Sequence, residues 1–228
     1  MKIVSWIDEK YINWEGLSKS NCSEAIQLLR ENPDKINWFW LSLNSSPEAI
    51  QLLQESPEEI VLYYLSRNSC CKESIQLLRE NPDKIDWGWL SENSCCEAIQ
   101  LLRENPDKIV WYRLSRNTCC EAIQLLRENP DKIDWNGLSI NSCCESIQLL
   151  RENPDKINWS GLFENTGGEA IQLFRENPDK IVWENLNMSS IEALMLLLEH
   201  PEKIDKVNLF TLSQNHHIFD DDDYVVTK

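Results

Sequence analysis

The amino-acid sequence predicts an all-α solenoid of about eight tandem units, each 24 residues long. Three observations predict this fold class: a recurring tryptophan, a long amphipathic helix pattern after it, and regular helix-ending signals. Because a unit this short buries its apolar face only against its neighbours, the array is expected to form one elongated domain. The recurring position is occupied by Trp14, Trp38, Leu62, Trp87, Trp111, Trp135, Trp159 and Trp183.

The two ends of the array depart from the repeat. Residues 1–13 resemble a degenerate half unit with a polar outer face, and they are predicted to cap the N-terminal end of the stack. Residues 14–206 carry the tandem units, with Lys72 as an extra residue at one point. After Trp183 the pattern decays, so residues 207–228 are predicted to form a C-terminal cap and a solvated tail, which contains the acidic run from Asp220 to Asp223.

The second half of each unit has the signals of a longer helix. Ser94 and Glu97 have the spacing of a capping box, in which each side chain binds a free backbone N–H at the helix start. The apolar residues that follow recur at intervals of three and four, which places them on one helix face. Asn105 and Pro106 are predicted to end the helix, because the residue before proline avoids the helical region and asparagine tolerates the left-handed region.

The first half of each unit predicts a short turn of α or 3₁₀ helix. Trp111 and Leu114 are three residues apart, and Ile109 precedes Trp111 by two. The alternation of Ile109 and Trp111 leaves a strand as the alternative, because leucine-rich repeats of similar length pair a strand with a helix. Against the strand, the two residues between Trp111 and Leu114 break the alternation, and the L-x-L core of leucine-rich repeats is missing.

Composition limits the classes of partner. A formal net charge of −16 would repel most of the surface from nucleic acid and from anionic membranes, so neither is expected as a partner. The beginning of the chain lacks an apolar signal segment, and the apolar runs are too short to span a bilayer. Nine cysteines without a secretory signal favour thiols in a reducing compartment, and we expect a cytoplasmic protein.

The amino-acid pattern of the repeat resembles that of a known group of proteins. The motif N-P-D-K-I-N-W-x-x-L-S-x-N, followed by A-I-x-L, runs from Asn32 to Leu53 and, with Phe163 in place of serine, from Asn153 to Leu173. It is similar to uncharacterised tandem repeats of large DNA viruses of amoebae, and the likeness covers roughly residues 10–206. The unit length also resembles the leucine-rich variant repeat, a superhelix of α and 3₁₀ helices. The resemblance implies a viral repeat protein in the host cytoplasm or virion, and it brings no catalytic residues.

One set of positions varies between units and predicts a binding surface. These positions lie one, two and five residues after the tryptophan, on one face of the short helix. In the first half of the array they carry aromatic and arginine side chains, which dominate interface hot spots. We therefore predict non-catalytic binding of a protein partner, with two alternatives: self-assembly into a homodimer or virion component, and rings that cover gaps between short helices. The candidate residues are Phe39, Trp40, Tyr63, Tyr64, Arg67, Trp89, Tyr112, Arg113 and Arg116.

Adjacent cysteine pairs are the other candidate site. They fall in the first turn of the long helix, where the helix dipole is expected to lower a thiol pKa and to favour metal binding or redox chemistry. Packing is the preferred interpretation, because Ser46-Pro47 and Gly167-Gly168 stand in the same places and the C-x₂-C spacing of zinc sites is missing. No metal or cofactor is therefore predicted. The alternative metal ligands are Cys70, Cys71, Cys95, Cys96, Cys119, Cys120, Cys143 and Cys144.

The sequence does not predict an enzyme. An enzyme built on a repeat array needs an irregular insertion that carries a nucleophile, a base or a cofactor loop, and the units show no such insertion. Histidine is nearly absent, with three residues in the chain. The repeated Arg-Glu pairs are expected to form a solvated face, on which stacking brings the arginine of one unit near the glutamate of the next.

Overall fold

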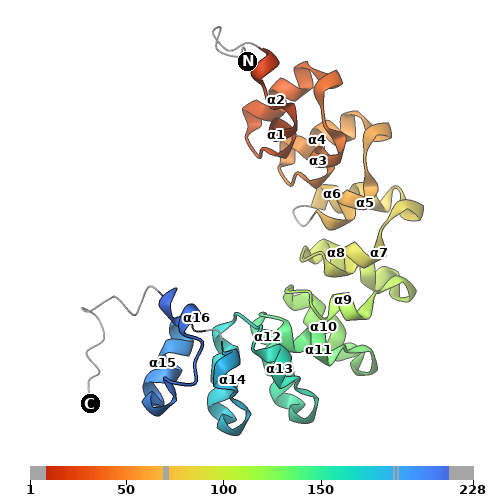
Figure 1. Cartoon of the computed structure of the whole chain (residues 1–228). Coiled ribbons are helices and arrows are strands. Elements are labelled where there is room, and N and C mark those ends of the chain that lie inside the picture. Colours follow the sequence, from red (N-terminus) through yellow and green to blue (C-terminus); the bar gives the residue numbers. More distant parts are fainter. Residues whose placement is uncertain (1–8, 69–71, 187, 189, 216–228) are drawn as a thin grey trace. The chain divides into compact units, whose positions relative to one another are not determined.

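The computed structural model describes residues 9–68, 72–186, 188 and 190–215. The described residues form α-helices and 3₁₀ helices and no β-strand (Figure 1). This finding confirms the predicted all-α repeat solenoid, and it shows that the strand-plus-helix alternative is wrong. The chain divides into two compact parts, residues 1–125 and residues 126–228.

Residues 1–125 contain alternating short and long helices that pack on their sequence neighbours (Figure 1). The short helices are α1 (Trp14–Lys19), α3 (Trp38–Leu43), α5 (Leu62–Arg67), α7 (Trp87–Glu92) and α9 (Trp111–Leu114). The long helices are α2 (Ser23–Glu31), α4 (Pro47–Glu55), α6 (Lys72–Arg79), α8 (Cys96–Glu104) and α10 (Cys120–Glu128), the last of which continues past the boundary.

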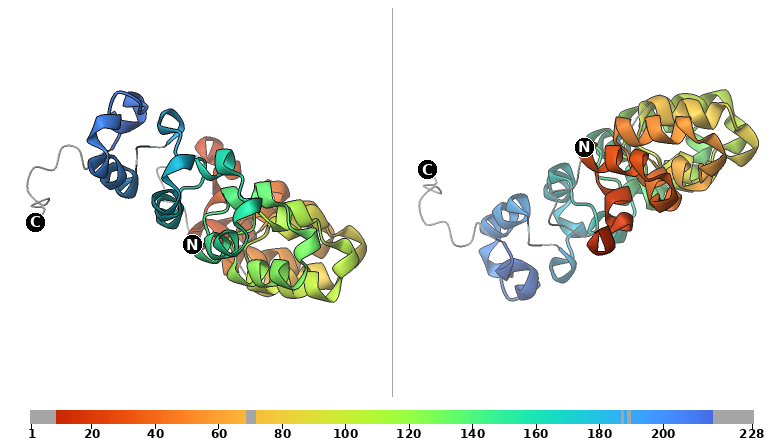
Figure 2. Two further views of the ribbon diagram at one scale, coloured as in Figure 1. Left: turned by 90° about the horizontal axis from the view of Figure 1, so that it is seen from below. Right: turned by 90° about the horizontal axis from the view of Figure 1, so that it is seen from above.

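Residues 126–228 repeat this arrangement. The helices are α11 (Trp135–Ile140), α12 (Cys144–Glu152), α13 (Trp159–Leu162), α14 (Gly168–Glu176), α15 (Ile191–Glu199) and α16 (Leu209–Ser213), with the 3₁₀ helix η9 (Trp183–Asn185) in the place of one short α-helix. Figure 2 gives two further views of the chain, and in this part the short helix α11 packs against the long helix α12.

The N-P-D-K segment of each unit forms a separate 3₁₀ turn. The first half of a unit therefore contains two short helices rather than the single turn that the sequence predicts. Proline suits the first position of each turn, because the N–H that it lacks would have no partner inside the helix. These turns are η2 (Pro33–Lys35), η3 (Pro57–Glu59), η4 (Pro82–Lys84), η5 (Pro106–Lys108), η6 (Pro130–Lys132), η7 (Pro154–Lys156), η8 (Pro178–Lys180) and η10 (Pro201–Lys203).

The two ends of the chain are described in part. Within the predicted N-terminal cap, η1 (Glu9–Tyr11) is a 3₁₀ helix, and residues 1–8 lie outside the described residues. Helix α16 falls within the predicted C-terminal cap, and the acidic run from Asp220 to Asp223 lies outside the described residues.

Two local predictions about the long helix are wrong. Helix α8 begins one residue later than predicted: Cys95 rather than Ser94 is its N-cap, with no side-chain capping bond. The cause is a bond from outside the helix, in which the Cys95 N–H donates to Asn93 Oδ1 at 2.9 Å. At the other end Asn105 has φ −132° and ψ 62°, and its amide donates to the Leu101 carbonyl at 2.9 Å. Asparagine therefore caps the helix through its side chain and not through a left-handed backbone.

The L-S-x-N motif joins each unit to the next. Its asparagine side chain donates to two main-chain carbonyls of the preceding unit at distances of 2.6–3.2 Å. Because the NH₂ donors of these buried amides are satisfied by carbonyls of the neighbouring unit, they fix the register of the two units. The asparagines that make these bonds are Asn44, Asn68, Asn93, Asn117, Asn165 and Asn215.

The serine of the same motif makes a second link. Its hydroxyl accepts a backbone N–H of the following unit at 3.0–3.1 Å. In most units the same hydroxyl also donates to the carbonyl four residues before it; Ser91, for example, donates to Trp87 at 2.7 Å. A hydroxyl can play both roles, which explains the preference for serine at a fully buried position. The serines that accept from the next unit are Ser18, Ser42, Ser66, Ser91 and Ser139.

Ion pairs between units run along the long helices. Arg30 pairs with Glu55 at 2.9 Å and Arg151 with Glu176 at 3.1 Å, and Arg79 pairs with Glu104 in the same way. The predicted arrangement of the Arg-Glu face is therefore confirmed. Each pair is partly exposed, so it contributes at most about 1 kcal/mol to stability, and hydrogen bonds and apolar burial hold the units together.

Candidate functional site

The candidate aromatic residues form one connected surface over the short helices of residues 1–125. We call it the aromatic surface and define it as Lys19, Phe39, Trp40, Tyr63, Tyr64, Arg67, Trp89, Tyr112 and Arg113. It begins at Trp40, whose ring lies 3.7 Å from the Lys19 ammonium nitrogen, measured to the ring centroid. Phe39 packs edge-on against Trp40 at 4.5 Å and against Tyr64 of the next short helix at 4.2 Å, both between ring centroids.

Trp89 is at the centre of the second half of this surface. Tyr63 links it to the first half, with centroid distances of 4.9 Å to Tyr64 and 6.4 Å to Trp89. Two guanidinium groups, from Arg67 and Arg113, each lie 4.6 Å from the Trp89 ring centroid. Each such cation–π contact contributes about 0.5–1 kcal/mol at exposed sites and holds the cation near the ring.

Arg113 is held in place by two further groups. Its guanidinium pairs with Glu92 at 2.9 Å, and its Nε donates to the Tyr112 hydroxyl at 3.0 Å. Three elements therefore meet at this point: α5 supplies Arg67, α7 supplies Trp89, and α9 supplies the arginine and the tyrosine. The repeat places them together because they stand one, two or five residues after the tryptophan position of their own units, on the same face of the short helix.

The surface is partly packed and partly open to solvent. Tyr63 is 45% exposed and Tyr112 55% exposed, whereas Phe39, Trp40, Tyr64 and Trp89 are half-buried. The half-buried rings cover the junctions between short helices, as expected if these rings fill gaps in the packing. The exposed rings remain available for contact. Tyr63 and Tyr112 therefore identify the part of the surface that a partner can reach.

Eight of the nine predicted residues meet in this surface. Arg116 is exposed, and no ring contact joins it to the described part of the surface. Lys19 was missed by the sequence analysis, although it lies five residues after Trp14, at the same repeat position as Arg67. The prediction rested on aromatic and arginine side chains, and lysine is neither.

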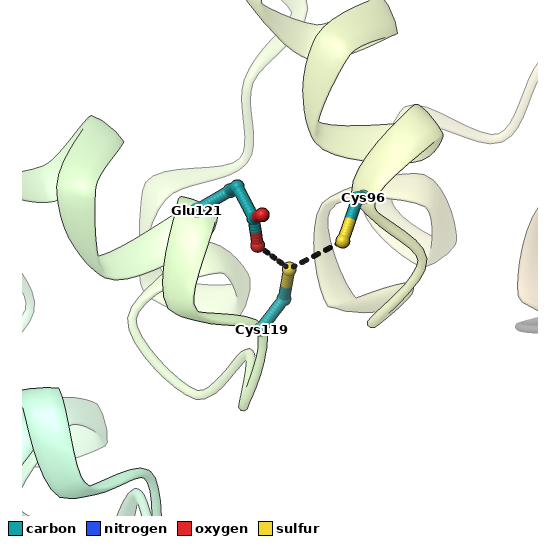
Figure 3. Close-up of side chains that lie close together, drawn as sticks. All are labelled: Cys96, Cys119 and Glu121. Carbon is teal, nitrogen blue, oxygen red and sulfur yellow. Dashed lines mark hydrogen bonds between the residues drawn. The ribbon is translucent and has the colours of Figure 1, made fainter.

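The second candidate site is a thiol cluster, which we define as Cys96, Cys119 and Glu121 (Figure 3). The sulfur atoms of Cys96, the first residue of α8, and Cys119, just before α10, are 3.7 Å apart. The Cys119 thiol donates to a Glu121 carboxylate oxygen at 2.8 Å. The structure therefore brings together the second cysteine of one unit and the first cysteine of the next, rather than the two members of a pair.

The other described cysteines differ in burial and in the groups beside them. Cys95 is half-buried and donates to Glu97 at 2.9 Å, and Cys143 is buried and donates to Glu145 at 2.7 Å. Cys120 and Cys144 are exposed, and Cys70 and Cys71 lie outside the described residues. In each described pair the first cysteine is thus the more buried, which agrees with the packing interpretation of that position.

The expected lowering of thiol pKa at the helix start is wrong for Cys95 and Cys119. Burial, together with the hydrogen bond to the Glu97 carboxylate, raises the pKa of Cys95 from 9.0 to about 11. Burial and the bond to Glu121 likewise raise the pKa of Cys119 to about 12. Desolvation and an anionic acceptor both favour the neutral thiol. Together they outweigh the lowering of the thiol pKa that the helix dipole would cause.

Cys95 is therefore expected to react with iodoacetamide roughly ten to a hundred times more slowly than free cysteine near neutral pH, because only the thiolate reacts. Substituting Glu97→Gln removes the anionic acceptor, lowers the thiol pKa and should accelerate the reaction several-fold. Peptide mass spectrometry of timed alkylation measures both rates. Glu48→Gln changes the same repeat position in a unit without cysteine and should leave the rate unchanged. Equal Cys95 rates in the wild type and the Glu97→Gln variant would show that the carboxylate has no part in the shift.

Comparison of the chain with protein-family models, curated proteins and solved structures gives no match. The class of protein is therefore defined by its fold, which is that of an all-α tandem-repeat protein. Among the described residues, no helix combines the length and the apolar character needed to cross a bilayer.

Proposed function

We propose that this chain is a non-catalytic repeat protein that binds a protein partner through the aromatic surface. The observation that carries the proposal is the placement of Trp89 between two guanidinium groups, next to the exposed Tyr63 and Tyr112. Tryptophan, tyrosine and arginine provide most of the binding energy in known protein interfaces. Aromatic side chains that are already fixed lose little conformational entropy on binding.

The charge of this surface supports a particular kind of partner. The chain as a whole has a formal net charge of −16, yet the aromatic surface carries three cations, Lys19, Arg67 and Arg113. Lys19 pairs with Glu15 at 2.6 Å and Arg113 with Glu92 at 2.9 Å, whereas Arg67 lies over the Trp89 ring. An exposed arginine among aromatic rings suits a partner segment with a carboxylate beside aromatic or aliphatic side chains. Complementary charge of this kind increases the association rate and excludes basic partners.

The resemblance of the repeat supports a further proposal about origin. The motif from Asn32 to Leu53 resembles repeats of large DNA viruses of amoebae, and we propose that the protein acts in the cytoplasm of an infected host cell or in the virion. An amoebal lysate is therefore the appropriate source of partners.

The double variant Tyr63→Ala/Tyr112→Ala is expected to reduce recovery of a specific partner from amoebal lysate at least tenfold, because it removes the exposed rings of the aromatic surface. Affinity capture with quantitative mass spectrometry measures this change. Both residues are exposed, so the circular dichroism spectrum should stay native. Phe210→Ala, a change of another exposed aromatic residue in α16, is the matched control and should keep full recovery. If the double variant and the wild type recover the same proteins, the aromatic surface does not bind the partner.

A further inference from the structure

We propose that Cys96, Cys119 and Glu121 form a zinc-binding site. This proposal is independent of partner binding by the aromatic surface. One ligand atom from each residue, two sulfurs and a carboxylate oxygen, lies within 4.8 Å of the other two. Thiolate and carboxylate are ligand types that Zn²⁺ accepts, and the set leaves a fourth tetrahedral position open.

The distance between the two sulfur atoms agrees with this metal. Two Zn–S bonds of about 2.3 Å at a tetrahedral angle place the sulfurs about 3.8 Å apart. The observed separation of Cys96 and Cys119 is 3.7 Å, so both ligands are in place before an ion binds. A linear metal–dithiolate arrangement with the same bond length would require about 4.6 Å. A disulfide would require about 2.05 Å, and the sulfurs would have to move far closer together.

The carboxylate requires only a small adjustment. Glu121 now accepts the thiol hydrogen of Cys119 at 2.8 Å, and in a tetrahedral site a sulfur and an oxygen ligand are about 3.5 Å apart. Because Glu121 is exposed at the second position of α10, its side chain can make this change by rotation. The exposure of Cys96 and Glu121 also allows water to reach the fourth position.

Packing alone does not account for the cluster. It explains a small residue at Cys119, which is 7% exposed, but it does not select cysteine at the exposed Cys96. Elsewhere in the chain the position of Cys96 is occupied by Ser23, Pro47 or Gly168, or by another cysteine. Only the juxtaposition across units gives this second thiol a ligand beside it.

The surrounding charge also favours a cation. Glu97 lies close enough to Glu121 for the two carboxylates to repel each other, and Lys72 is the neighbouring cation that acts on Glu97. A divalent ion at the thiol cluster would relieve this repulsion, and it would neutralise most of the charge on two thiolates and a carboxylate. It would also join α8 to α10, and thereby link two consecutive units through metal bonds.

The test measures zinc content with matched variants. The wild-type chain is freed of metal, equilibrated with excess Zn²⁺ and desalted, and its zinc-to-protein ratio is determined by elemental analysis. The variant Cys96→Ser/Cys119→Ser should hold one equivalent less zinc than the wild type. Cys22→Ser is the control, because Cys22 also donates to a carboxylate two residues on, at 2.8 Å to Glu24, but belongs to no such cluster of described residues. It should hold as much zinc as the wild type.

A spectroscopic readout identifies the ligands. Co²⁺ in place of Zn²⁺ should give a thiolate-to-metal charge-transfer band that weakens in the single variant Cys96→Ser, which changes an exposed residue and keeps the fold. Glu121→Gln should lower the affinity for Co²⁺ at least tenfold while the band remains. Equal zinc content in the wild type and the double variant overturns the proposal, and so does a Co²⁺ spectrum that is the same with and without the Cys96 thiol.

Discussion

Replacing Asn93 with alanine is expected to lower the free energy of unfolding by about 3 to 6 kcal/mol. The Asn93 amide donates to the Ser66 carbonyl at 3.1 Å and to the Asn68 carbonyl at 2.9 Å, and its oxygen accepts the Cys95 N–H. Asn93 is 3% exposed, so alanine would take this partner from two buried carbonyls and from the N–H of the half-buried Cys95. Each unsatisfied group costs roughly 1–3 kcal/mol, which makes the expected effect much larger than that of a surface substitution.

Chemical denaturation followed by circular dichroism measures this change. Asn21→Ala is the matched control, because it makes the same substitution at an exposed asparagine, and it should change stability by no more than about 0.5 kcal/mol. Asn93→Asp should destabilise as alanine does, since a carboxylate cannot donate to the two carbonyls. A loss of less than about 1 kcal/mol for Asn93→Ala would mean that the asparagine bonds between units contribute little net stability.

Phe174→Ala is expected to destabilise residues 126–228 by about 3–5 kcal/mol, the usual range for removal of a buried aromatic ring. Phe174 is fully buried in α14 and stacks on Phe163, with ring centroids 4.6 Å apart and planes at 19°. The Trp159 ring also packs against Phe174, with ring centroids 5.9 Å apart. Both phenylalanines already line a cavity of about 160 Å³, and loss of the ring would enlarge this empty space.

The loss of stability should increase with the side-chain volume that is removed at Phe174. Phe174→Leu restores the residue that most other long helices carry at this position, and it should destabilise by less than half as much as alanine because leucine fills most of the same space. Thermal unfolding of both variants gives the comparison. Phe210→Ala, at an exposed ring, controls for the loss of an aromatic residue as such. Equal unfolding temperatures for the alanine and leucine variants would contradict this volume argument.

Most of the fold was predictable because the sequence repeats its own local signals. The spacing of Ala98, Ile99 and Leu102 identified the buried face of α8, and all three are at most 1% exposed. The start of the same helix was predicted one residue too early, because the Cys95 N–H binds Asn93 and not a capping serine. The S/T-x-x-E pattern carries no information about an asparagine that is itself fixed by the preceding unit.

The candidate sites were predicted unequally for a related reason. The aromatic surface follows from three variable positions that recur in successive units, so its rings and two of its three cations were predictable from the repeat. The thiol cluster joins Cys96 to Cys119 across units, whereas the sequence draws attention to Cys95 and Cys96, which are adjacent in the chain but point into different surroundings. A search that compared each unit with the next, residue by residue, would have found this pair.

Phe163 occupies the repeat position of Ser18, Ser42, Ser66, Ser91 and Ser139, and each of these serines accepts an N–H from the following unit. It has no hydroxyl and cannot accept such a bond; its ring stacks instead on Phe174 of the same unit and lines a small cavity. In an array stabilised by nearest-neighbour interfaces, cooperativity is lowest where an interface is weakest. We expect the units on either side of Phe163 to be joined less strongly for this reason, and the Arg175–Glu199 ion pair at 2.9 Å still links α14 to α15. A single change in the repeat is thus expected to limit how far local unfolding spreads.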